Sequence, residues 1–161
     1  MAAPWWRGAR GEWYVAVQVV LILLIVLGPK TWHGWPAWPF PEGWPVRLGG
    51  FALLAGGGCL ALSGIVRLGR ALTPLPYPAS NAVLLQTGPY RIVRHPMYCG
   101  VIFAALGWAL VTKGWLRIAY VVVGFAFLVL KVRREEAWLV ERFPEYAAYQ
   151  RRVRKLIPFV Y

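Results

Sequence analysis

Charged residues are scarce in this sequence, and acidic residues are the scarcest. Lys, Arg, Asp and Glu make up 15% of the 161 residues, and only six residues are acidic, whereas 59% are hydrophobic. Soluble domains contain roughly 45–50% apolar residues, so this composition favours a membrane protein. No segment has the mixed composition of a second globular unit, and we therefore predict a single membrane domain over residues 1–161.

Cysteine is also rare, which excludes a disulfide-rich scaffold. The two cysteines, Cys59 and Cys99, both lie inside apolar segments, where free buried thiols are common. The net charge of +12 would suggest a nucleic-acid partner in a soluble protein. Because long apolar stretches dominate this chain, we predict a membrane partner, no nucleic acid and no metal ligands.

Four uncharged stretches are candidate membrane helices: residues 13–29, 48–66, 96–112 and 118–130. A span needs about 20 mostly apolar residues, so the first and fourth stretches are short, and Arg117 and Lys131 can lengthen the fourth by snorkelling. Arg7 and Arg10 precede the first stretch, but no small-residue cleavage site follows it, which indicates a retained helix rather than a signal peptide. We predict an all-α integral membrane fold with about four transmembrane helices.

The connections predict how these helices pack. Only residues 113–117 separate the third and fourth stretches, so these two should form an antiparallel helical hairpin. Residues 30–45 alternate tryptophan with proline, which is typical of an interfacial loop. Glycines that allow close helix packing recur through the second stretch: Gly49, Gly50, Gly56, Gly57, Gly58 and Gly64.

Basic residues predict the orientation of the chain. Fourteen of the 18 Lys and Arg residues fall on the side that holds both termini, and four (Lys30, Arg47, Lys113 and Arg117) fall on the other. The positive-inside rule then predicts a multi-pass protein with cytoplasmic termini, in a bacterial or archaeal inner membrane. Residues 135–155 have an amphipathic helical pattern with a break at Phe143-Pro144, and their basic surface suits anionic headgroups.

Two polar clusters border the predicted hairpin. In residues 88–100, Pro96 is suited to the first position of a helix, His95 to its cap, and Arg94 adds a charge at a helix start that attracts anions. Gly100, one turn on, would let a ligand approach the backbone. A capped helix with an interfacial Arg-His pair explains the same residues.

The second cluster is the pair Glu135 and Glu136, at the predicted cytoplasmic end of the fourth stretch. Ionisable groups at that depth are costly and usually have a function, although pairing with Lys131, Arg133 or Arg134 is the alternative. The hairpin brings the two clusters together. An arginine and a helix start opposite carboxylates suit the charges of S-adenosylmethionine, and Tyr90 and Tyr98 suit its sulfonium.

At these residues the sequence resembles the superfamily of isoprenylcysteine carboxyl methyltransferases and phospholipid methyltransferases. The resemblance covers residues 72–158, and its core is the stretch from Thr87 to Gly100 followed by Glu135-Glu136-Ala137-Trp138-Leu139. It implies an S-adenosylmethionine pocket formed by the last two spans and the C-terminal segment. The implied catalytic residues are Arg94 and Glu136, and the implied cofactor-binding residues are Tyr90, His95, Pro96, Tyr98, Gly100, Glu135 and Glu136.

The resemblance implies a methyltransferase for a lipid or a prenylated substrate, and leaves carboxylate O-methylation and headgroup N-methylation open. Pro144 departs from the glycine that relatives often have there. An NADPH-dependent, sterol-reductase-like enzyme is the alternative, although those relatives typically have Asn in place of Met97. A lipid-binding protein without catalysis is the non-enzyme alternative, and the oligomeric state is not predicted.

Overall fold

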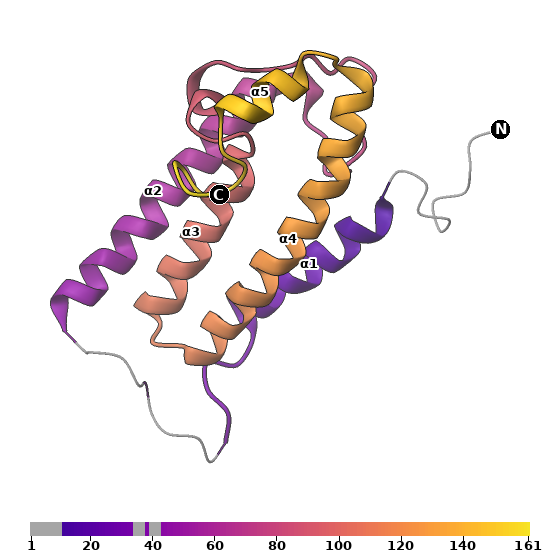
Figure 1. Ribbon diagram of the computed structural model, residues 1–161. Coiled ribbons are helices and arrows are strands. Elements are labelled where there is room, and N and C mark those ends of the chain that lie inside the picture. Colours follow the sequence, from indigo (N-terminus) through magenta and orange to yellow (C-terminus); the bar gives the residue numbers. More distant parts are fainter. Residues whose placement is uncertain (1–10, 34–37, 39–42) are drawn as a thin grey trace.

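The structure is a computed structural model that describes residues 11–33, 38 and 43–161. Four long helices run side by side: α1 (Glu12–Leu27), α2 (Trp44–Leu68), α3 (Pro96–Val111) and α4 (Trp115–Arg142). The short α5 (Tyr146–Arg152) lies at one end of them (Figure 1). Two 3-10 turns, η2 (Gly69–Ala71) and η3 (Gly88–Arg91), flank the long connection from α2 to α3. Within the described ranges the chain forms no strand beyond one isolated bridge between Val93 and Arg154, so the predicted all-α class is confirmed.

The helices differ in how well they suit a membrane span. Among the described residues, α4 and the segment formed by α2 and η2 are long and apolar enough to cross a bilayer. Helices α1 and α3 are apolar but have 16 residues each. Large apolar side chains of α1 face outward, such as Val20 at 55% and Leu23 at 50% exposure. Such a surface suits lipid, and the count of four spans stays a prediction.

The end of α4 differs from the prediction. Residues 135–142 continue α4 instead of beginning a separate amphipathic helix, because no proline or glycine interrupts them. The helix ends before Phe143, whose extended backbone precedes Pro144, as predicted from the restriction that proline places on the preceding residue. The remaining helical part of the C-terminal segment is the seven-residue α5.

Helices α2 and α3 pack closely through glycine. Gly50, Gly57 and Gly64 are the buried residues of α2, and their spacing of seven places them on one face. A Cβ at Gly57 would lie 2.5 Å from the Ala104 nitrogen of α3, whereas one at Gly56 would meet nothing within 4 Å. The packing predicted for the glycines is therefore confirmed for these three, while Gly49, Gly56 and Gly58 face open space.

The predicted hairpin is formed by α3 and α4, which pack together and are joined by residues 112–114. It returns the chain to the end of the molecule where α3 began, close to α5 (Figure 1). There the buried Lys131 of α4 donates hydrogen bonds to Gln18 of α1 and to the Pro74 carbonyl oxygen. This lysine therefore joins α1, α4 and the connection after α2. Arg7, Arg10 and Trp35, which served the predictions of orientation and of an interfacial loop, lie outside the described residues.

Candidate functional site

The segment before α3 is fixed by the C-terminal end of the chain. The backbone nitrogens of Arg94 and His95 donate to the carbonyl oxygens of Arg154 (2.8 Å) and Lys155 (3.2 Å). Pro96 then begins α3, where its missing N–H costs nothing. These contacts place two polar side chains, each less than 10% exposed, at the start of the apolar helix α3.

Glu136 of α4 is the buried anion of this site, with a side chain that is 7% exposed. Its carboxylate accepts hydrogen bonds from Arg94 Nε at 2.8 Å, Tyr146 OH at 3.2 Å and Gln150 Nε2 at 3.2 Å. His95 Nε2 lies 3.2 Å and Lys155 Nζ 3.6 Å from it. A buried carboxylate needs such partners, and here they come from the start of α3, from α5 and from the segment after α5.

Arg94 is bound within the protein rather than free in the pocket. Besides Glu136, its guanidinium donates through Nη1 to the carbonyl oxygens of Gln150, at 3.0 Å, and Val153. The planar guanidinium suits several fixed acceptors at once. These contacts favour a positioning role, in which Arg94 ties the end of α5 to α4.

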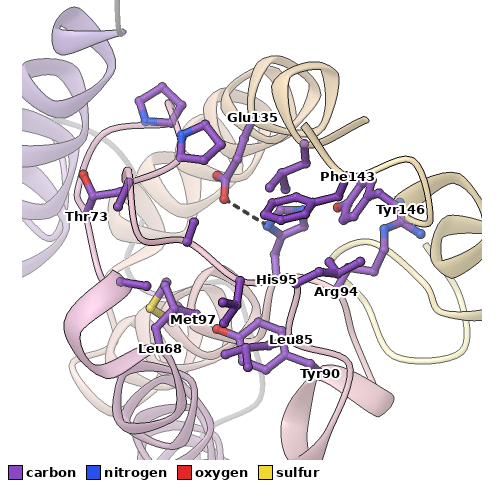
Figure 2. A pocket seen from close by; sticks show the side chains of 18 of the residues that line it. Leu68, Thr73, Leu85, Tyr90, Arg94, His95, Met97, Glu135, Phe143 and Tyr146 are labelled. Carbon is purple, nitrogen blue, oxygen red and sulfur yellow. Dashed lines mark ion pairs between the residues drawn. The ribbon is translucent and has the colours of Figure 1, made fainter. Parts of the chain in front are cut away.

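Glu135 has different surroundings from its neighbour. Its Oε2 accepts a hydrogen bond from Tyr98 OH at 2.9 Å, and its Oε1 lies 3.8 Å from His95 Nδ1. Figure 2 shows the side chains of Glu135 and His95, which both line the pocket, pointing toward each other. The His95 ring also stacks on Tyr98, with centroids 5.7 Å apart. The side chain of Glu135 is 22% exposed and can therefore meet a ligand.

These residues form the polar end of a largely apolar pocket. Its cavity volume is about 100 Å³. Arg94, His95 and Glu135 give the pocket its charged and polar groups, and Tyr90 also lines it (Figure 2). Most other lining side chains are apolar and come from the connection after α2, from α3 and from α4, among them Leu75, Val83, Leu85, Met97 and Leu139.

Buried tyrosines support this end of the pocket as neutral hydrogen-bond donors. Burial raises the pKa of Tyr146 well above its usual range, and burial also raises the pKa of Tyr149 to about 12. Tyr149 OH donates to the carbonyl oxygen of Tyr90. Since both phenols stay protonated at neutral pH, Tyr146 donates to Glu136 and Tyr149 donates to η3 without adding charge.

Comparison with known proteins identifies the family of this chain. The sequence model of the phospholipid methyltransferase family matches residues 46–146, which include the start of α3 and both glutamates. The chain belongs to this family. The match thus covers most of the described helices, from α2 to the beginning of α5.

The relatives of this chain are named for different functions. The chain is 31% identical over 154 residues to the cobalt-zinc-cadmium resistance protein CzcN of Cupriavidus metallidurans, covering 94% of this chain and 64% of that one. It is 36% identical over 83 residues to the protein-S-isoprenylcysteine O-methyltransferase of Saccharomyces cerevisiae, covering 50% and 35%. A steroid 5-alpha-reductase of Solanum lycopersicum is 34% identical over 74 residues, covering 46% and 28%. The chain spans less than two thirds of the length of these relatives.

Most of the residues predicted for the site of this phospholipid methyltransferase family member lie together. Tyr90, Arg94, His95, Pro96, Tyr98 and Glu135 line the pocket, whereas Glu136 lies behind it as the partner of Arg94 and His95. Gly100 does not line it. A Cβ there would meet the Gly57 carbonyl oxygen and lie 2.5 Å from the Ala61 nitrogen. The close approach at Gly100 is thus to α2, and its predicted contact with a ligand has no support from this geometry.

Sequence reasoning missed several residues of the site. Tyr146, Gln150 and the carbonyl oxygen of Val153 bind the buried Arg94–Glu136 pair, and the apolar residues of the connection after α2 line the pocket. The amphipathic pattern of residues 135–155 did not indicate that this segment covers the start of α3.

Proposed function

We propose that this protein is a membrane methyltransferase that uses S-adenosylmethionine to methylate a lipid or a prenylated substrate. The observation that carries the proposal is the convergence of Tyr98 and His95 from the start of α3 with Glu135 from α4. They meet at the polar end of an apolar pocket. The family of the chain and the methyltransferase activity for which its yeast relative is named support the reaction class.

The residues present fit the chemistry of S-adenosylmethionine. Glu135 has a carboxylate that can accept from an ammonium group or a ribose diol, and Tyr90 lines the pocket with an aromatic ring of the kind that attracts a sulfonium. When bound, S-adenosylmethionine supplies an electrophilic methyl group on its sulfonium.

The chain itself contributes alignment and exclusion of water. In-line displacement at a methyl group depends chiefly on holding the two reactants in place. The Arg94–Glu136 pair fixes His95 and the end of α5, so we assign these two charged residues a positioning role instead of the direct one first predicted. The apolar lining would receive an acyl or prenyl chain.

The acceptor group decides whether a base is needed. A carboxylate acceptor is already nucleophilic, whereas an ammonium headgroup must first lose a proton. Glu135 and His95 are the groups at the polar end that can take it. We propose a lipid or a prenylated substrate and leave both acceptors open.

The same proposal includes a topology. We propose four spans, α1 to α4, with both termini and the pocket on the cytoplasmic side of a bacterial or archaeal inner membrane, and a cofactor-binding region over residues 72–158. The basic asymmetry along the sequence supports this orientation.

Two other functions suggested by relatives have less support. The likeness to a steroid 5-alpha-reductase covers 46% of this chain and makes a nicotinamide-dependent enzyme the alternative. The relative from Cupriavidus metallidurans is named for metal resistance. Within the described part of the chain no three His, Cys, Asp or Glu side chains are grouped as a metal site needs, and we propose no metal-binding role.

Transfer of a labelled methyl group tests the proposal. Purified protein in lipid vesicles is incubated with methyl-tritiated S-adenosylmethionine and lipid extracts, and the lipid fraction is counted. We expect incorporation by the wild type that falls at least tenfold in Glu135→Gln. Incorporation that is absent from every extract, or equal in both proteins, would contradict the proposal.

A further inference from the structure

The segment after α5 returns along the helices instead of ending above them. Leu156 is fully buried and packs in one core cluster with Tyr98 of α3 and with Leu128 and Val132 of α4. Leu128 belongs to the uncharged stretch predicted to cross the membrane. Figure 1 shows the C-terminal end alongside the helices, on the bundle side of α5. The segment therefore reaches the depth of the apolar part of α4.

The tip of this segment carries apolar side chains that the protein does not cover. Phe159 is 84% exposed and Val160 is 72% exposed. The tip is closed into a turn, because the nitrogen of Leu156 donates to the Tyr161 oxygen at 2.7 Å and that of Tyr161 to the Ile157 oxygen at 3.0 Å. Two large apolar side chains on a closed turn, at the depth of a membrane helix, suit contact with lipid chains.

Basic side chains precede the tip. Arg151, Arg152 and Arg154 are exposed. Arg152 donates to Gln86 at 2.9 Å, whereas the side chains of Arg151 and Arg154 make no hydrogen bond or ion pair with any residue that the structure describes. Cations next to an apolar tip match a leaflet that carries anionic phospholipid.

The same segment holds the candidate site. The carbonyl oxygens of Arg154 and Lys155 accept from the backbone of Arg94 and His95, and that of Val153 accepts from the Arg94 guanidinium. Lys155 Nζ lies 3.6 Å from Glu136. A force that holds this segment in place therefore also holds the residues at the start of α3.

We propose that residues 151–161 form a membrane-binding strap. Phe159 and Val160 insert into the leaflet nearest the pocket, and Arg151 and Arg154 bind its anionic headgroups. An anionic leaflet then stabilises the strap against Arg94 and His95 and tightens cofactor binding. The effect on cofactor binding rests on the proposed function, whereas the insertion of the strap does not.

Spin labelling tests the insertion. The full chain with Cys59→Ser carries a nitroxide at Phe159→Cys or, as the control, at the exposed Ser80→Cys in the connection after α2; Cys99 is buried. In vesicles of phosphatidylcholine with phosphatidylglycerol, we expect the label at 159 to be relaxed more by oxygen than by a water-soluble nickel complex. The label at 80 should show the reverse. Equal access of the nickel complex to both labels would overturn the proposal.

Binding of S-adenosylhomocysteine tests the coupling to the site. Replacing part of the phosphatidylcholine by phosphatidylglycerol should raise the affinity of the wild type on the order of fivefold, the effect of about one arginine at an anionic surface. Arg151→Gln with Arg154→Gln should lose this increase. The matched control, Arg70→Gln with Arg133→Gln, removes the same charge from exposed positions outside the strap and should keep it.

The outcomes separate the two proposals. An increase that persists unchanged in the strap variant, or no increase in the wild type, would overturn the coupling. If S-adenosylhomocysteine binds in neither kind of vesicle, the proposed function fails, and the spin labels still decide whether the strap enters the membrane.

Discussion

Glu135 and Glu136 are neighbours in the sequence, but their carboxylates serve different parts of the molecule. Adjacent residues of a helix point about 100° apart, so Glu135 faces the pocket with Tyr98 while Glu136 points toward Arg94 and Tyr146. One glutamate is therefore available to a ligand, and the other neutralises a buried guanidinium.

This difference predicts opposite effects of the same substitution. Glu136→Gln leaves Arg94 buried without its counter-charge and should destabilise the fold by about 3 kcal/mol. Glu135→Gln should leave thermal stability nearly unchanged, because its side chain is partly exposed, and should weaken S-adenosylhomocysteine binding by roughly tenfold or more. Thermal unfolding in detergent and calorimetry measure the two effects. Equal losses of stability in both variants would show that the division of roles is wrong.

Tyr149 predicts a dependence on alkaline pH. Burial raises its pKa to about 12 in the folded protein, against about 10 in an unfolded chain. The phenol therefore adds stability that is fully present below about pH 10 and is lost as the pH rises through about 12. The difference in unfolding free energy between wild type and Tyr149→Phe should be constant up to about pH 10 and then fall. A difference that stays constant up to about pH 12 would contradict the burial of this group.

At the scale of the elements, the contact between α2 and α3 determines where the start of α3 lies. Helix pairs in lipid approach closely where small residues face each other. In this pair Gly57 and Gly100 face one another, with no room for a Cβ on either. The pocket lies one turn away, so a change in the distance between the two helices would displace His95 and Tyr98.

Two glycines that are adjacent on α2 provide a matched test. Gly57→Ala places a methyl group 2.5 Å from the Ala104 nitrogen and should cost about 1–3 kcal/mol, because backbone cannot move aside as a flexible side chain can. Gly56→Ala makes the same chemical change where nothing lies within 4 Å, and should be neutral or slightly stabilising. Thermal unfolding in detergent compares them, and a larger loss at Gly56 would contradict the packing.

The positions of the helices could largely be predicted from the sequence, whereas the segments that pack against them could be predicted only in part. Uncharged runs and Pro96 indicated where α1 to α3 lie, and Pro144 indicated where α4 ends, because these are local signals. The length of α4 was underestimated, because the helix continues through the charged residues that follow the apolar run. The return of residues 153–161 onto the start of α3 depends on contacts between distant segments, for which the sequence has no local signal.

At the scale of the whole molecule, the motif residues were predictable as a group because the hairpin forces both clusters to one end. Their individual roles stay predictions. The resemblance implied that Arg94 and Glu136 are catalytic, whereas the structure binds them to one another and to the C-terminal segment. Whether a charge meets a ligand or an internal partner depends on the packing of α5, which periodicity does not specify.

The proposed topology can be tested with single cysteines in a Cys59→Ser background. A cysteine at Ser80 should be protected from a membrane-impermeant maleimide added to intact cells, and one at Trp32, which is 63% exposed, should react. The opposite pattern would reverse the orientation, and reaction at both sites would contradict the four-span arrangement.

The central claim is that the pocket between α3, α4 and the C-terminal segment binds S-adenosylmethionine. Calorimetry of the purified protein with S-adenosylhomocysteine, and separately with NADPH, tests it most directly. We predict saturable binding of S-adenosylhomocysteine that weakens by roughly tenfold or more in Glu135→Gln, and no binding of NADPH. Binding of NADPH with no binding of S-adenosylhomocysteine would contradict the account and favour the reductase.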